Sequence, residues 1–463
     1  MLRLYDTARQ AVQPLRTRDE GRVAMYVCGP TVYEVPHLGH GRFSLVWDVA
    51  RRWLTFSGLS VHYVSNITDV DDKIIAKAAS EGVGEADVAA RYEADWWVTM
   101  ARLGVARPDD VPHATAYVDE MVAAIEELLA RGAAYLAPEG VYFDVASVPD
   151  YGLLAHQDLA DLRAGARVET SEHKRSPLDF ALWKAAKPGE PAWEAPFGRG
   201  RPGWHTECVV MSLGLLGEGF DLHCGGLDLK FPHHENERAQ AEALGRPFAR
   251  HWGHNGFVMV GEDKMSKSLG NFTTLGDLLA TSDPRAYRLL VLRSHYRSPI
   301  EVSPATTGDA ERALARLDAL ARRFDLPALA GERLERRADH PLGASAGAVL
   351  DAMALQMDDD LDTPGAVATL FEALGAANAA ADRGEEDFAR DLARAVAVGF
   401  GALGLALVAD AGEVDDLARG LATERDEARA TRDWARADQL RDELVARGYV
   451  VEDGPSGTVL RRG

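Results

Sequence analysis

Two short segments, more than two hundred residues apart, carry side chains suited to holding phosphate groups. They read His37-Leu38-Gly39-His40 and Lys264-Met265-Ser266-Lys267-Ser268. The two imidazoles can donate hydrogen bonds to phosphate oxygens, and the glycine leaves the backbone open to close approach. The two lysines stand out because the chain has 8 lysines beside 43 arginines, and a lysine on a flexible stem suits a mobile phosphate clamp. Alone, each segment could be a solvated surface loop; together they predict one ATP site at which developing negative charge is neutralised.

A second set of residues carries donor atoms that a transition metal prefers. His233 and Glu237 are four residues apart, so on a helix they share one face. Thiolates from Cys28, Cys208 or Cys224 would complete a tetrahedral site, and this mixture of ligands fits zinc better than magnesium or calcium. The alternative is a set of small buried cysteines beside the first turn of a helix.

The elements expected around both groups form a β-α-β unit. Residues 23–27 are a short apolar run typical of a buried strand, residues 41–56 have apolar side chains at helical spacing, and residues 61–67 read as a second strand. Units of this kind bind ligands at the carboxyl ends of their strands. The histidine pair lies at that end, and no Gly-x-x-x-x-Gly-Lys-Ser loop competes for the nucleotide. We therefore expect an α/β fold with a Rossmann-type, doubly wound parallel sheet.

The rest of the chain divides by composition. A middle section interrupts the α/β rhythm with a strand-like Val141-Tyr142-Phe143, and the rhythm returns before a helix that starts at Pro232. Beyond residue 309 the spacing is helical as far as a strand-like run at Tyr449. We expect a catalytic domain in two halves (1–119 and 203–255), a connective insertion (120–202), a stem-contact region that holds the lysine loop (256–307), an α-helical bundle (308–421) and a small C-terminal domain (422–463).

Composition limits the classes of protein that fit. A chain of 463 residues is too long for one core, and its net charge of −21 argues against indiscriminate nucleic-acid binding. The N-terminus lacks the apolar core of a signal peptide, and the longest uncharged stretch, residues 395–409, is too short to span a bilayer. Three cysteines cannot form a disulfide framework and fit a reducing compartment. We expect a cytoplasmic protein with no membrane partner.

Several motifs resemble one family from end to end. The histidine and lysine segments are similar to the two ATP-binding motifs of class I aminoacyl-tRNA synthetases. The further motifs that resemble the bacterial cysteinyl-tRNA synthetases, in chain order, are Met25 to Gly29, Thr31 to Tyr33, His37 to Arg42, Asn66 to Asp69, Gly203 to His205, Phe231 to Glu237, Lys264 to Asn271, Asp433 to Ala435 and Val451 to Thr458.

The resemblance implies both an activity and its residues. It implies activation of L-cysteine by ATP with Mg²⁺, transfer to cysteine tRNA, and an anticodon-binding module in residues 422–463. The implied ligands of one zinc ion are Cys28, Cys208, His233 and Glu237. His37, Gly39, His40, Lys264 and Lys267 would bind ATP, with Lys267 as the chief lysine of its loop. Thr68 and Trp204 would frame the amino-acid pocket.

The metal explains how such an enzyme would select cysteine. Zinc binds a thiolate far better than a serine hydroxyl, so we expect no second, hydrolytic site in the insertion. Cys224 is expected to be a bystander in the pocket wall. By resemblance we also expect a monomer, since no apolar heptad seam suggests a partner helix.

Two other functions fit the same motifs. A cysteine ligase of mycothiol synthesis would share the activation chemistry and the zinc but pass cysteine to an aminosugar, and it would lack the C-terminal module. A non-catalytic tRNA- or zinc-binding paralogue would not need both ATP motifs intact.

Overall fold

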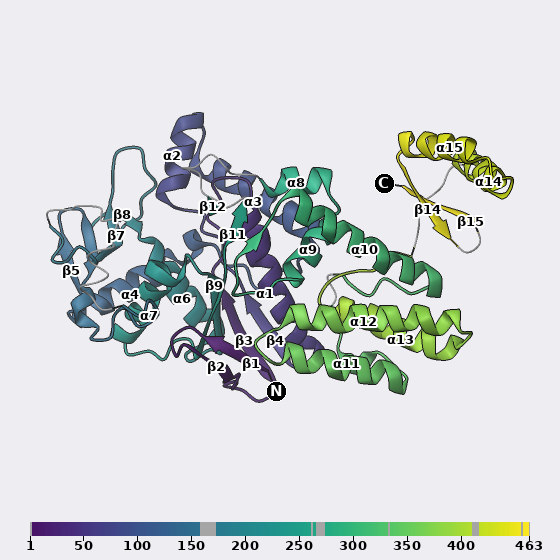
Figure 1. The fold of residues 1–463 in the computed structure, drawn as a ribbon. Coiled ribbons are helices and arrows are strands. Elements are labelled where there is room, and N and C mark those ends of the chain that lie inside the picture. The colour runs from purple at the N-terminus through teal and green to yellow at the C-terminus, as the bar shows by residue number, and fades with distance from the viewer. Residues whose placement is uncertain are drawn as a thin grey trace.

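The computed structural model describes most of the chain, and Figure 1 shows its arrangement. The α/β part runs through the purple and teal segments, the green helices pack beside it, and the yellow C-terminal module lies apart from both. The described residues are 2–157, 173–260, 263–264, 274–331, 334–409, 416–454 and 457–462.

The central sheet confirms the predicted doubly wound parallel architecture. Its four strands have the order β10-β9-β3-β4, and all neighbours are parallel. Strands β3 and β9 are far apart in sequence but adjacent in the sheet, so the switch point of the topology lies between them. The elements are β3 (Arg22–Val27), α1 (Leu38–Phe56), β4 (Ser60–Val64), β9 (Leu222–Gly226) and β10 (His251–Asn255).

Two boundaries differ from the sequence prediction for physical reasons. Helix α1 begins at Leu38, earlier than the apolar spacing indicates, because His37 caps it. Strand β4 ends at Val64. The loop that follows it pairs with the segment after β3 through an isolated bridge between Thr31 and Thr68. The first difference places the histidine motif in the first turn of α1, and the second leaves residues 65–67 in a loop at the carboxyl edge of the sheet.

The insertion forms its own sheet. Its strands pair antiparallel in the order β5-β6-β7-β8 and enclose an apolar core with helix α4. The predicted strand at Val141-Tyr142-Phe143 is part of β6. The elements are α4 (Val118–Ala130), β5 (Ala134–Ala137), β6 (Gly140–Phe143), β7 (Phe180–Ala185) and β8 (Gly200–Pro202).

Further helices and short strands complete the α/β part. A helical hairpin, α2 (Asp72–Glu81) and α3 (Glu85–Arg102), follows β4, and helix α6 (Trp204–Leu216) follows the insertion. The remaining elements of this part are β1 (Arg3–Asp6), β2 (Ala11–Pro14), α7 (Glu235–Ala243), β11 (Val258–Val260), β12 (Asp263–Lys264), α8 (Leu275–Thr281), α9 (Pro284–Leu292) and β13 (Ile300–Glu301).

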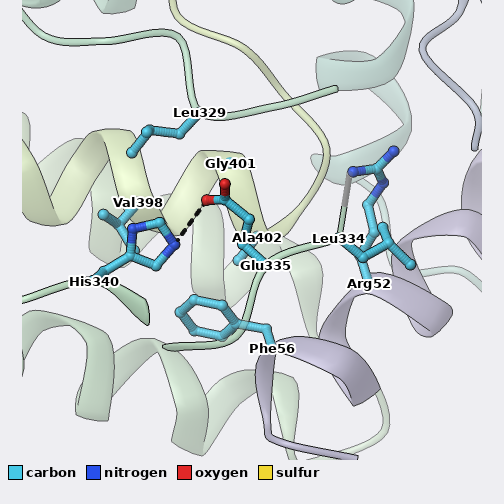
Figure 2. A pocket seen from close by; sticks show the side chains of 9 residues that line it. All are labelled: Arg52, Phe56, Leu329, Leu334, Glu335, His340, Val398, Gly401 and Ala402. Atoms are coloured by element: carbon cyan, nitrogen blue, oxygen red, sulfur yellow. Dashed lines mark ion pairs between the residues drawn. The ribbon is translucent and has the colours of Figure 1, made fainter. Parts of the chain in front are cut away.

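The predicted helical section packs against the back of α1. Its helices are α10 (Pro304–Phe324), α11 (Ala344–Met357), α12 (Thr363–Asp382) and α13 (Glu386–Ala402). Figure 2 shows the junction, where Arg52 and Phe56 of α1 and Val398 of α13 are among the residues that line a small pocket. Its volume is about 10 Å³. An ion pair of 3.1 Å between His340 Nε2 and Glu335 closes one side.

The C-terminal module has a core of its own. Helices α14 (Asp416–Ala430) and α15 (Trp434–Ala446) pack on a hairpin of β14 (Tyr449–Gly454) and β15 (Gly457–Arg462). The strand-like run predicted at Tyr449 is therefore β14. Across the described parts of the chain, we find no helix long and apolar enough to cross a lipid bilayer.

Candidate functional site

Four buried donor groups meet at the carboxyl end of strand β3. Cys28 follows β3, Cys208 lies on α6, and His233 and Glu237 lie one helical turn apart at the start of α7. Their donor atoms lie within 4.8 Å of one another. The two sulfur atoms are 3.8 Å apart and both thiols are free. The structure therefore brings together all four residues that the resemblance implied as metal ligands.

The spacing of these donors fits a tetrahedral metal. Two thiolates bound to one zinc ion at tetrahedral angles would be about 3.8 Å apart, and a thiolate and an imidazole about 3.6 Å. Here Cys208 Sγ lies 3.6 Å from His233 Nε2, and Cys28 Sγ lies 3.5 Å from Glu237 Oε1. The group could therefore hold one metal ion with little rearrangement.

The electrostatics of the group favour a cation. Burial by itself raises the pKa of Glu237, but His223 and His233 outweigh it and hold that pKa well below its usual range. Burial also disfavours the charged form of His233, yet the neighbouring Glu237 and Cys208 raise its pKa to about 10. The pKa of Cys208 is lowered to about 6, because hydrogen bonds from Cys28 and His233 outweigh its burial. Glu237 and Cys208 are therefore the anionic members of the group, and the charged His233 balances them. By contrast, burial, Cys208 and Glu237 raise the pKa of Cys28 well above its usual range.

Neighbouring histidines hold two of the four donors in place. His223 Nε2 lies 2.6 Å from Glu237 Oε2, and His205 Nδ1 lies 2.9 Å from His233 Nδ1. Such second partners orient metal ligands. A second set of donors, Cys28, His223, His234 and Glu237, is also close enough together to bind one ion. Cys224 belongs to neither set and is packed in the main apolar core.

Thr68 and Trp204 both lie beside the metal-ligand group. The hydroxyl of Thr68 donates a 2.5 Å hydrogen bond to Glu207 Oε1, and Glu207 precedes Cys208 on α6. The indole of Trp204 stacks on the imidazole of His233 with ring centroids 4.0 Å apart. Trp204 is still partly exposed, at 36%. Trp204 therefore borders the open space beside the group, whereas Thr68 is buried and its hydroxyl is engaged by Glu207.

The histidine pair caps helix α1 reciprocally. The backbone N–H of His40 donates to His37 Nδ1 at 3.2 Å, and the backbone N–H of His37 donates to His40 Nδ1 at 3.3 Å. Both Nδ1 atoms are acceptors, so in each neutral ring the proton lies on Nε2, which can donate to a phosphate. The rings stack with centroids 3.7 Å apart. A methyl group at Gly39 would come within 2.9 Å of His37 Nδ1, so glycine at this position preserves the stack.

Burial keeps both imidazoles neutral. Desolvation lowers the pKa of His37 to about 4, although Asp228 partly opposes it. Desolvation also lowers the pKa of His40, and the charges of His37 and Lys73 lower it further. At neutral pH the pair therefore offers hydrogen-bond donors without positive charge.

One cavity of about 350 Å³ joins the two groups. It is lined by Cys28 and Trp204 at the metal end and by His37, Gly39 and His40 at the start of α1. Its walls come from the carboxyl ends of β3, β9 and β10, on both sides of the switch point. This is where a doubly wound sheet binds nucleotides.

The lysine segment is only partly described. Lys264 ends strand β12, which pairs with β11 next to the cavity-lining Val258. Met265, Ser266, Lys267 and Ser268 lie outside the described residues.

Two charged residues of the cavity wall were not predicted from the sequence. Lys73 of α2 and Asp228, which follows β9, both line the cavity. The rarity of lysine that drew attention to the Lys264 segment would also have singled out Lys73. Asp228 had no comparable signal, because acidic residues are common in this chain.

Comparison with protein families accounts for most of the chain. Residues 14–312 match the model described as tRNA synthetases class I (C) catalytic domain. Residues 354–408 match a DALR domain, and residues 410–461 match a cysteinyl-tRNA ligase anticodon binding domain.

Individual relatives agree with these models. The chain is 46% identical to a cysteine–tRNA ligase of Alkalilimnicola ehrlichii and 44% identical to one of Chromobacterium violaceum, with all of both chains covered in each case. Its fold is similar to Mycobacterium tuberculosis methionyl-tRNA synthetase in complex with methionyl-adenylate, with a TM-score of 0.59 at 16% identity over 82% of this chain and 89% of that one. A putative arginyl-tRNA synthetase from Campylobacter jejuni is similar with a TM-score of 0.52 at 13% identity over 84% of this chain and 93% of that one. On its sequence, its fold and the residues gathered at its cavity, the chain belongs to the cysteine–tRNA ligase family of class I aminoacyl-tRNA synthetases.

Proposed function

We propose that the single cavity between the metal-ligand group and the histidine pair carries out both steps of cysteine–tRNA ligation. As a family member, the chain is an ATP-dependent ligase that joins cysteine to tRNA. One observation carries the proposal for the site: a buried group that can bind sulfur through a metal opens into the same space as two phosphate-directed imidazoles.

The metal is zinc, and its ligands are Cys28, Cys208, His233 and Glu237. Two thiolates, an imidazole and a carboxylate are the mixture that zinc prefers, and the donor distances match its bond lengths. When bound, zinc would supply a coordination position for the substrate thiolate, which a serine hydroxyl fills poorly. Thr68 and Trp204 would confine the rest of the small amino acid.

The first step needs charge compensation more than a protein nucleophile. A carboxylate oxygen of cysteine attacks the α-phosphorus of ATP, the bond from that phosphorus to the bridging oxygen breaks, and pyrophosphate leaves. His37 and His40 would donate from Nε2 to phosphate oxygens, with Gly39 keeping their rings stacked. Lys264 and Lys267 would neutralise the pyrophosphate, and Mg²⁺ would accompany ATP.

In the second step the terminal ribose hydroxyl of cysteine tRNA attacks the activated carbonyl carbon. The hydroxyl proton passes to solvent water, the bond from that carbon to the phosphate oxygen breaks, and AMP leaves with the bonding electrons. The stem-contact region (256–307) and the C-terminal module (422–463) would hold the tRNA while residues 1–119 and 203–255 perform the chemistry. The insertion (120–202) and the helical bundle (308–421) complete the proposed division.

We also propose a cytoplasmic monomer. Three buried cysteines without disulfides fit a reducing compartment. The proposed monomer rests on the lack of an apolar heptad seam in the sequence.

Pyrophosphate exchange tests the activity and its lysine loop together. Labelled pyrophosphate should enter ATP only when cysteine is present, serine should not replace it, and Lys267→Ala should lower the rate sharply. Exchange that proceeds equally with serine would contradict selection by a metal. Absence of any exchange from the wild-type protein would favour the non-catalytic paralogue.

A further inference from the structure

Lys73 lies in the cavity wall close to the histidine pair. It is the second residue of α2, and its ammonium group lies 5.1 Å from the ring centroid of Tyr33, in the segment between β3 and α1. Both residues line the cavity together with His37 and His40. Lys73 is also close enough to His40 to lower the pKa of that imidazole, after burial and His37. The lysine and the histidine pair therefore share one region of the site.

The cavity needs a fixed cation in this region. Because burial holds the pKa of His37 at about 4 and that of His40 well below its usual range, neither imidazole is positively charged at neutral pH. Among the cavity-lining residues that the structure describes, Lys73 is the only lysine or arginine, and Asp228 contributes negative charge. A triphosphate bound beside the neutral imidazoles of His37 and His40 would thus meet the positive charge of Lys73 in the described part of the cavity wall.

The helix holds Lys73 in position through its neighbours. The carboxylate of Asp71 caps α2 by accepting the backbone N–H of Lys73 at 2.9 Å. The carboxylate of Asp72 is bound by Lys184 of β7 and Arg201 of β8. In the described part of the chain, no carboxylate lies within 4.0 Å of the Lys73 ammonium group. Two acidic neighbours thus anchor the backbone while the side chain stays available for an anion.

We propose that Lys73 binds the α-phosphate of ATP, and later the phosphate of the adenylate, as a fixed counterpart of the lysine loop. Cysteine is short, so its carboxylate and the phosphorus that it attacks must stay close to the metal end of the cavity. Lys73 lies over Tyr33, in the segment that connects β3 and Cys28 to the histidine pair, and it lines the same cavity as Cys28. The inference rests on the proposed ATP site and assigns it one further phosphate-binding residue.

Paired nucleotide affinities test the inference. AMP carries only the α-phosphate and adenosine carries none, so Lys73→Met should weaken AMP by about tenfold, as expected for one charge-assisted hydrogen bond, and leave adenosine unchanged. Lys73→Arg should recover part of the loss. The matched control is Lys77→Met, one turn further along α2, whose ammonium lies over Tyr92 and pairs with Glu81 at 3.2 Å. Lys77→Met should bind AMP and adenosine with the affinities of the wild type.

The outcomes separate this inference from the proposed function. Equal affinities of wild type and Lys73→Met for AMP, or equal losses for AMP and adenosine, would overturn the role of Lys73. Loss of ATP affinity with AMP unaffected would overturn it too, since the lysine would then serve the pyrophosphate. In each case, cysteine-dependent exchange by the wild-type protein would still stand, and only its absence would overturn the proposed function.

Discussion

Cysteine and serine differ by one atom, and at the scale of single residues that atom must be recognised by a group that distinguishes sulfur from oxygen. Shape alone discriminates weakly between side chains of such similar size, by about 1–3 kcal/mol. Two thiols, one imidazole and one carboxylate with donor atoms within 4.8 Å offer a stronger means, because a metal held there would bind a thiolate preferentially.

Removal of one thiol distinguishes the two possible ligand sets. Cys208→Ala should lose bound zinc and cysteine-dependent exchange, because Cys208 contributes a sulfur 3.8 Å from Cys28. Zinc content by atomic absorption checks this. Cys224→Ala is the matched control: it should keep zinc and lose about 1 kcal/mol of stability from the buried sulfur. Zinc retained in Cys208→Ala would favour the set that contains His223 and His234, and zinc lost only in Cys224→Ala would overturn both sets.

The glycine between the histidines allows a second test. Gly39→Ala should weaken ATP binding, because the new methyl group would come within 2.8 Å of the His37 ring and displace it from the stack. Nucleotide titration measures the affinity. Gly375→Ala lies within α12 with open space around it, so it should bind ATP normally and gain about 0.5–1 kcal/mol of stability. Unchanged ATP affinity in Gly39→Ala would show that ATP binding does not require the stacked arrangement of His37 and His40.

The residues of the site were predictable where a rare side chain or a fixed spacing marked them. The four-residue interval from His233 to Glu237 indicated one shared helix face, and the structure has their side chains paired at 2.9 Å. The contact of Trp204 with His233 could not be read from the sequence, because it depends on how α6 packs beside α7. Lys73 could have been singled out by the rarity of lysine, whereas Asp228 carried no such signal in a chain rich in acidic residues.

At the scale of elements, helix α1 connects the site to the rest of the protein. Its first turn carries the histidine pair, and its middle carries the buried Asp48. Asp48 is bound by Arg52 at 2.8 Å and by Arg288 of α9 at 2.7 Å. Arg288 in turn donates to the carbonyl of Leu403, which follows α13. One carboxylate therefore ties the helix behind the site to α9 and to the helical bundle.

Loss of that carboxylate charge should destabilise the whole catalytic part. Asp48→Asn leaves two buried guanidinium groups without their anion, so the free energy of unfolding should fall by about 3 kcal/mol or more. Urea unfolding at pH 7 measures it. The control Asp382→Asn removes an exposed partner of Arg323 and should cost less than about 1 kcal/mol.

The contribution of the Asp48 carboxylate to the free energy of unfolding should fall at acidic pH. Burial raises the pKa of Asp48, but Arg52 and Arg288 outweigh it, so the pKa in the folded protein lies below the unfolded value of about 3.9. Stability from this group is therefore fully present above about pH 4 and is lost as the pH falls through the lower folded value. The difference between wild type and Asp48→Asn should shrink in that acidic range. A constant difference would show that the carboxylate charge is not its cause.

The elements themselves were predictable to different degrees. Strand β3 and helix α1 have clear apolar spacing, and both were expected close to their observed bounds. Strand β10 reads His-Trp-Gly-His-Asn, in which Trp252 is the one usual strand former, so its pairing with β9 in a buried sheet could not be predicted from composition. The hairpin of β1 and β2 was also not predicted, and the residue that follows β1, Thr7, donates its backbone N–H to the carbonyl of Trp252 in β10.

At the scale of the whole molecule, we expect activation and acceptor choice to reside in different parts. The cavity belongs to the α/β part, whereas the C-terminal module has a separate apolar core that includes Leu421, Leu440 and Leu444. Removal of residues 410–463 should therefore leave cysteine-dependent exchange within about twofold of wild type and reduce tRNA charging strongly. Parallel exchange and charging assays measure both. A comparable fall in exchange would contradict this separation.

One acceptor assay tests whether this chain activates cysteine and delivers it to tRNA. The protein is incubated with ATP, labelled cysteine and two acceptors, cysteine tRNA and glucosaminyl-inositol, with labelled serine in a parallel reaction. We expect label from cysteine on the tRNA alone and none from serine. Label on the aminosugar without charging of the tRNA would show that tRNA is not the acceptor. Charging of the tRNA with serine at a comparable rate would show that the site does not select cysteine.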